Sequence, residues 1–142
     1  MESKNVYITF VTDTVKDGGM ARNNAFNEYF KDSDFKIYNI WNDNKIRRVF
    51  NMFHIVLFPF FKSNINVFVH LGIFTEVFPR FFLRKFLGFL FFKIWFRLLS
   101  QKNILTIEIN DLPYKQSVDL GLFIEPFYKR FEKLIFNPKF GN

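Results

Sequence analysis

The stretch from Val6 to Phe30 constrains the fold of this chain more than any other part of its sequence. It opens with the β-branched and aromatic residues of a buried strand, continues with the pair Gly18-Gly19, and from Ala21 onward places apolar residues at helical spacing. We therefore expect Gly18 and Gly19 to lie between the first strand and the first helix. Glycine there lets a ligand approach N–H groups at the helix N-terminus, where the helix dipole favours anions.

This glycine pair has two interpretations. As a binding feature, Gly18, Gly19, Met20 and Arg22 would form a seat for a phosphate or an anionic sugar. As a structural feature, the pair would be an ordinary turn that uses glycine for steric reasons only. The stretch contains neither the dinucleotide motif G-x-G-x-x-G nor the G-K-[ST] of a P-loop, so the usual nucleotide fingerprints do not choose between the two.

Three further strand and helix pairs follow along the chain. Strands are predicted over 35–41, 65–70 and 103–109, and helices over 45–61, 79–99 and 118–136. This alternation predicts one α/β domain over residues 1–142. Its core would be a doubly wound, mostly parallel Rossmann-like sheet with helices on both faces and right-handed crossovers.

Each of these three helices contains a proline, and in two of them the proline helps to place an end. The helix over 45–61 should end near Pro59, and the last helix should break at Pro126. For the helix over 45–61, the apolar pattern predicts an inward face made by Ile46, Val49, Phe50 and Phe53. His54, inside the same apolar run, is expected to serve packing.

Polar residues follow the end of each predicted strand, where ligands bind in sheets of this type. Beyond the Asp13 to Arg22 loop, these are Trp41 to Asp43, His70, and the run that contains Glu108, Asn110 and Asp111. His70, Glu108, Asn110 and Asp111 are the candidate catalytic residues.

Each of these candidates also has a plainer interpretation. His70 also fits an ordinary core histidine, and Asp111 before Leu-Pro fits a turn or cap residue. A hydrolase with Glu108 and Asp111 as paired carboxylates is a further alternative, although the sequence does not fix the distance between the two groups.

Three motifs in the order of the chain resemble a known family. Gly18 to Arg22 resembles the Gly-Gly-x-x-Arg loop that opens the N-terminal, acceptor-side domain of GT-B-type glycosyltransferases in retaining family four. Val67 to Gly72 looks like that family's valine-rich strand followed by His-x-Gly. Ile107 to Pro113 resembles its later strand end, usually a His-Asp-Leu-Pro type of sequence. Asn110 stands where many members have a histidine near the reacting sugar, which departs from the pattern.

The resemblance implies a function. The chain would be half of a GT-B fold, a truncated or split enzyme that lacks the C-terminal domain holding the nucleotide-sugar. The amides around Gly18 and Gly19 would face the donor's diphosphate or the acceptor, with Arg22 positioning the loop. The reaction would use no metal and no cofactor beyond the nucleotide-sugar as donor substrate. The expected partners are a donor-binding domain or subunit and a lipid-linked or saccharide acceptor, and the isolated chain is expected to be inactive.

The basic charge lies in the middle of the chain. The whole sequence carries a net charge of +7, and the segment from Asn44 to Ile107 holds ten basic residues against one acid, Glu76. The chain has no cysteine, which excludes disulfides and thiolate chemistry. The N-terminus lacks a signal-peptide pattern, and the longest uncharged runs fall short of a membrane span.

One segment predicts contact with an anionic membrane surface. Phe78 to Leu99 interleaves aromatic rings with basic residues and contains no acid. The expected contact residues are Arg80, Arg84, Lys85, Lys93, Trp95 and Arg97. The domain would then lie in the cytoplasm, peripheral at the inner face of the membrane, where a glycosyltransferase would build cell-surface polysaccharide or glycolipid. The alternative is a crossover helix packed in the core.

Two other function classes remain. One is a non-catalytic basic α/β domain that docks on an anionic membrane or on a protein partner. The other is single-strand nucleic-acid binding, which a basic aromatic segment suits but for which no RNP, KH or zinc signature is present. We therefore expect no nucleic-acid partner.

Overall fold

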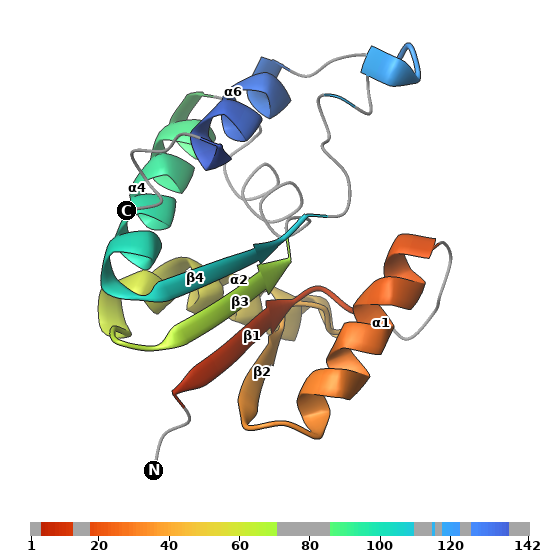
Figure 1. The fold of residues 1–142 in the computed structure, drawn as a ribbon, viewed down its shortest axis with the longest axis vertical. Coiled ribbons are helices and arrows are strands. Elements are labelled where there is room, and N and C mark those ends of the chain that lie inside the picture. Colours follow the sequence, from red (N-terminus) through yellow and green to blue (C-terminus); the bar gives the residue numbers. More distant parts are fainter. Residues whose placement is uncertain are drawn as a thin grey trace.

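The computed structural model of the chain describes residues 4–12, 18–70, 86–109, 115, 118–122 and 126–136. Strands and helices alternate along these residues in the predicted order (Figure 1). The strands are β1 (Asn5–Thr9), β2 (Phe35–Asn39), β3 (Asn66–His70) and β4 (Ile104–Glu108). The helices are α1 (Gly18–Lys31), α2 (Lys45–Phe61), α4 (Phe86–Lys102) and α6 (Pro126–Ile135).

The four strands form one parallel sheet in the order β2-β1-β3-β4. The chain leaves β1 toward β2 on one side and returns across β1 to place β3 on the other side. The strand order therefore reverses between β1 and β3, which is where open α/β sheets bind their ligands. Helices lie on both faces, with α1 on one and α2 and α4 on the other (Figure 1). The predicted fold class, a doubly wound parallel sheet, is confirmed.

Side chains alternate between these two faces because successive residues of a strand point in opposite directions. On β1, Val6 and Ile8 enter the core beneath α2 and α4, whereas Tyr7 faces α1. A smaller aromatic cluster lies on the α1 side. There the ring of Phe30 is 4.5 Å from the rings of Tyr7 and Phe35 and 5.1 Å from that of Phe68, between ring centroids.

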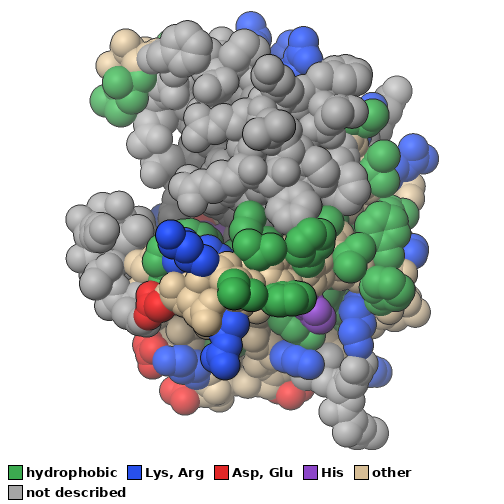
Figure 2. All heavy atoms as spheres, turned by 180° about the vertical axis from the view of Figure 1, so that it is seen from behind, with side chains coloured by type: hydrophobic (Ala, Val, Ile, Leu, Met, Phe, Trp, Pro, Cys, Tyr) green, Lys and Arg blue, Asp and Glu red, His purple; other side chains and the backbone are tan. Residues whose placement is uncertain are grey.

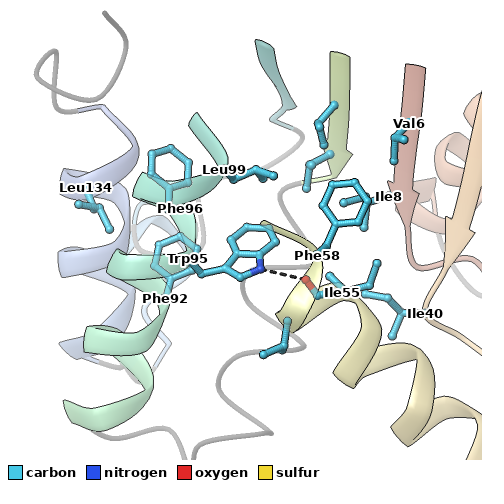
Figure 3. Close-up of a cluster of buried hydrophobic side chains, with 13 residues drawn as sticks. Val6, Ile8, Ile40, Ile55, Phe58, Phe92, Trp95, Phe96, Leu99 and Leu134 are labelled. Carbon is cyan, nitrogen blue, oxygen red and sulfur yellow. Dashed lines mark hydrogen bonds between the residues drawn. The ribbon is translucent and has the colours of Figure 1, made fainter. Parts of the chain in front are cut away.

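The larger core lies between the sheet, α2 and α4 (Figure 3). Helix α4 contributes four buried residues at helical spacing, Phe92, Trp95, Phe96 and Leu99. Figure 3 shows the Trp95 indole directed toward α2, where its Nε1 donates a hydrogen bond of 2.9 Å to the carbonyl oxygen of Ile55. Trp95, which the sequence placed at a membrane surface, is instead fully buried.

The orientation of α2 also differs from the prediction. Ile46, Val49, Phe50 and Phe53, expected to face the core, are between 46% and 68% exposed. The buried residues of this helix lie in its second half and are Ile55, Val56, Phe58 and Pro59. The pattern misled because α2 carries apolar residues around most of its circumference, so that periodicity does not choose the inner side.

Several helix boundaries are corrected as well. Gly18 and Gly19 are the first two residues of α1, not a turn before it. Glycine destabilises a helix chiefly in its interior, through the conformational entropy of its backbone, so the pair costs less at the start of α1. Helix α2, in contrast, has the predicted bounds, Lys45–Phe61, and includes Pro59. Pro126 opens α6, a position that suits proline, and the chain turns before it at Gly121, whose φ is +63°.

The start of the helix predicted over 79–99 lies outside the described residues. Its described part, α4, continues three residues beyond Leu99 to Lys102.

Candidate functional site

His70 and Glu108 lie side by side at the carboxyl ends of β3 and β4. They are register partners, each the last residue of its strand. Neighbouring positions in parallel strands direct their side chains to the same face, here the α1 face. His70 Nδ1 is 3.0 Å from Glu108 Oε2, and both side chains are at least 93% buried. The sheet register alone thus brings together two of the predicted site residues.

Arg22 completes a three-residue cluster from the other layer. It lies in the second turn of α1, and its Nη2 is 2.6 Å from Glu108 Oε1. Glu108 is thereby held between a guanidinium on one oxygen and an imidazole on the other. The Arg22 side chain is 51% exposed, so it bridges the buried carboxylate and the solvent. This contact places the first turns of α1 at the carboxyl edge of the sheet.

The cluster favours a neutral histidine. Burial, followed by the nearby positive charge of Arg22, lowers the pKa of His70 from 6.5 to about 4. Arg22 already neutralises Glu108, and a positive charge on the buried His70 ring would therefore go uncompensated. A neutral imidazole in contact with a carboxylate carries its proton on Nδ1, because Glu108 can only accept. Nε2 then holds a lone pair, and no described residue forms a hydrogen bond with it.

Aromatic side chains fix the position of the His70 ring. Its centroid is 5.9 Å from that of Phe26, edge to face, and 6.3 Å from that of Tyr7. Burial, reinforced by the charge of Glu108, raises the pKa of Tyr7 to about 12, so this phenol is neutral throughout the physiological range. Tyr7 is a neighbour of the cluster that sequence reasoning missed. The signal available was its position in the strand, since it alternates with Val6 and Ile8 and so faces α1.

The other predicted site residues are distributed as follows. Gly18, Gly19 and Met20 form the first turn of α1, which Arg22 continues. Asn110 and Asp111 lie outside the described residues, so the paired-carboxylate hydrolase stays an untested alternative. The loop from Trp41 to Asp43 is engaged by α2, because the Arg48 guanidinium lies 3.5 Å above the Trp41 ring and donates to the Asn42 carbonyl. Among the described residues there is no cluster of three potential metal ligands.

A groove lies away from this cluster, between β2 and α2. It has a volume of about 460 Å³ and is lined by Ile37, Tyr38, Asn39, Phe50, Asn51, His54 and Ile55. The His54 ring stacks on that of Tyr38 with 5.1 Å between centroids, so His54 packs against the sheet as expected although it stays exposed. The groove does not contact His70 or Glu108.

The predicted membrane-contacting residues divide into three groups. Lys93 and Arg97 are exposed on the outer side of α4, whereas Trp95 is in the core. Arg80, Arg84 and Lys85 lie outside the described residues. Among the described helices, none has the length and apolar content needed to cross a bilayer.

Comparison with known proteins returned no match. Neither the protein-family models nor the curated proteins nor the solved structures contain a significant counterpart to this chain. The resemblance to glycosyltransferases is therefore a proposal, and its support comes from the motifs of the sequence and the cluster described above.

Proposed function

We propose that this chain is the acceptor-side domain of a nucleotide-sugar-dependent glycosyltransferase of cell-surface polysaccharide or glycolipid synthesis. It would act together with a donor-binding domain or subunit, at the inner face of the cytoplasmic membrane. The observation that carries the proposal is the cluster of Arg22, Glu108 and His70 at the carboxyl edge of the sheet, beside the start of α1. The three residues belong to three separate motifs of the family resemblance.

Each member of the cluster has a role in this proposal. His70, neutral and oriented by Glu108, has a buried Nε2 lone pair that lacks a donor among the described residues, and a sugar hydroxyl that reached this atom would donate to it. Glu108 acts as a positioning residue that fixes the tautomer and the ring of His70. Arg22 and the N-terminal amides of α1 attract the negative charge of a diphosphate or of an anionic sugar. Transfer from a nucleotide-sugar requires one cleft that binds both a sugar hydroxyl and a diphosphate.

The chain supplies one wall of such a cleft. Glycosyl transfer of this kind develops positive charge on the sugar ring, and preorganised groups around the whole ring stabilise it. The donor-binding partner would close the second wall and exclude water. We therefore assign binding and orientation of the acceptor to this chain, with the nucleotide held mainly by the partner.

The two histidines of the chain allow a direct test. Nitrogen-15 NMR of the imidazoles should show His70 as the neutral Nδ1–H tautomer, with His70→Gln identifying its signals. Adding UDP- or GDP-linked sugars together with a prenyl-diphosphate-linked saccharide should shift the Nε2 signal of His70 and leave that of His54 in place. Arg22→Gln should weaken this response. If the His70 signals stay unchanged with every sugar, the site does not bind this substrate class.

The second candidate is a non-catalytic basic domain that docks on a membrane or on a protein partner. It is favoured by a separate observation, the exposed apolar side of α2. It predicts that membrane binding survives when the NMR experiment shows no sugar binding.

A further inference from the structure

The outer side of α2 exposes a continuous set of large apolar residues. We call this set the α2 outer surface, and its members are Ile46, Val49, Phe50, Phe53, Leu57, Phe60 and Phe61. Their exposed fractions run from 44% to 78%. At 3.6 residues per turn they occupy an arc of about 120°, while Ile55 and Phe58 occupy the opposite arc and enter the core. A helix that is apolar on both sides is normally covered on both sides.

Basic residues border this surface. On the helical wheel Lys45 lies on one side of the arc and Arg47 on the other, and α2 contains no acidic residue. On the neighbouring strand, the Lys36 Nζ lies 5.2 Å above the Tyr38 ring, which in turn stacks on His54 of α2. Figure 2, which shows the molecule from behind, displays a band of hydrophobic side chains with Lys and Arg at its sides and below it. Apolar residues bordered by cations match the phospholipid boundary, where anionic headgroups meet acyl chains.

We propose that the α2 outer surface docks on a bilayer that contains anionic phospholipid. Helix α2 would lie parallel to the membrane plane, with its phenylalanines among the acyl chains and Lys45 and Arg47 at the headgroups. This placement differs from the one that the sequence predicted, because the aromatic rings of α4 at Phe92, Trp95 and Phe96 are in the core. It is also independent of the proposed function, since it requires no sugar and no residue of the Arg22 cluster.

Charge argues against a second copy of the chain as the occupant. Lys45 and Arg47 lie at the N-terminal end of α2, and Lys62 follows its C-terminal end. Two copies packed through the α2 outer surface would bring like charges together whether the helices ran parallel or antiparallel, which is unfavourable. An anionic bilayer has the opposite charge and accepts the same apolar residues.

The absence of cysteine allows the contact to be located with a single label. Phe50→Cys carries an environment-sensitive fluorophore on the α2 outer surface, and Tyr29→Cys carries it on the exposed side of α1. The native exposures of these two positions are 68% and 71%, which makes them a matched pair. With vesicles of phosphatidylcholine and phosphatidylglycerol, the fluorescence emission of the label at position 50 should shift to the blue. Brominated acyl chains should quench this emission. The label at position 29 should do neither. Equal responses at both positions, or none at position 50, would overturn the proposal.

Sedimentation with the same vesicles tests separately what the apolar residues and the basic residues of α2 contribute to membrane binding. Phe50→Ser with Phe61→Ser should lower the binding constant about tenfold or more, whereas Tyr29→Ser with Ile104→Ser, equally exposed, should not. Lys45→Gln with Arg47→Gln should weaken binding to anionic vesicles more than Arg130→Gln with Lys133→Gln, which removes the same charge from α6.

Two controls make the sedimentation result decisive. Circular dichroism and the unfolding midpoint establish that each variant folds. If neither the double serine variant nor the double glutamine variant of α2 binds the vesicles more weakly than the native chain, the proposal is overturned. A dimer in the absence of lipid that Phe50→Ser with Phe61→Ser dissociates would also overturn it.

Discussion

The Trp95 indole donates its hydrogen bond to the one carbonyl oxygen of α2 that Pro59 leaves without its usual donor. In an α-helix the N–H at position 59 would donate to the carbonyl of Ile55, and proline has no N–H. Trp95 Nε1 takes that place at 2.9 Å, from a neighbouring helix. An interruption within α2 thus becomes the point at which α4 attaches to it.

This relationship predicts a coupling between the two residues. Trp95→Phe should lower the free energy of unfolding by about 2 kcal/mol, because it leaves a buried carbonyl oxygen without a donor. In a Pro59→Ala background the new N–H can serve that oxygen, so the same substitution should cost about 1 kcal/mol less. A double-mutant cycle measured by urea unfolding gives the difference directly. Additive effects of the two substitutions would contradict this account.

The lowered pKa of His70 predicts a stability that depends on pH. Above pH 6.5 the histidine is neutral in both the folded and the unfolded chain. Between pH 6.5 and about 4 only the unfolded chain gains the proton, so stability should fall as the pH is lowered and level off below the folded pKa. The full loss would be about 3 kcal/mol. Urea unfolding at several pH values should show this slope in the native chain and in His54→Gln. His70→Gln should flatten it, and an unchanged slope in that variant would assign the effect to other groups.

The contact between Arg22 and Glu108 predicts that replacing Arg22 lowers the free energy of unfolding more than replacing Lys31, which lies on the same helix. Arg22→Gln leaves a buried carboxylate without its cation and should cost about 1–3 kcal/mol of unfolding free energy. Lys31→Gln removes an exposed pair with Glu28 on the same helix and should cost no more than about 0.5 kcal/mol. Restoring neutrality with Glu108→Gln should recover part of the Arg22→Gln loss. Equal costs for the two single substitutions would mean that the buried pair adds nothing to stability.

The proposed division of labour predicts that the isolated chain does not transfer sugar. Purified protein given UDP- or GDP-linked sugars and a saccharide acceptor should show no turnover, because only one wall of the cleft is present. Adding a separately produced donor-binding domain should restore transfer, and Gly19→Val should abolish it again. Turnover by the chain alone would contradict the assignment of donor binding to a partner.

The order of the elements and the class of sheet could be predicted from sequence because each strand is a short apolar run beside a helical pattern. The sequence predicts that His70 and Glu108 lie at the same edge of the sheet, but it does not predict that they contact each other. Strand ends identify the edge of the sheet, but the pairing of position 70 with position 108 depends on the register between β3 and β4. The role of Arg22 needed in addition the rotation of α1 against the sheet, which no local pattern specifies.

The errors on α2 and α4 have a common cause. Both helices are rich in phenylalanine on more than one side, and an apolar residue looks the same in sequence whether it faces a core, a partner or solvent. The sequence pattern therefore predicts Ile46 and Phe50 inward and Trp95 outward, the reverse of their positions in the structure. The indole of Trp95 could have given a signal, since Pro59 already marks a carbonyl in need of a donor.

The position of Glu108 in β4, the last strand among the described residues, has a consequence for how the molecule assembles. Arg22 and His70 are synthesised well before their shared carboxylate, and they acquire it only when β4 pairs with β3 in the correct register. A slip of one residue would turn position 108 to the opposite face and separate all three groups. The pairing of β4 is a long-range step of the kind that forms slowly in parallel sheets. Burial of the His70 imidazole therefore reports that β4 has docked, so its proton signal can time the docking of β4 during refolding or synthesis.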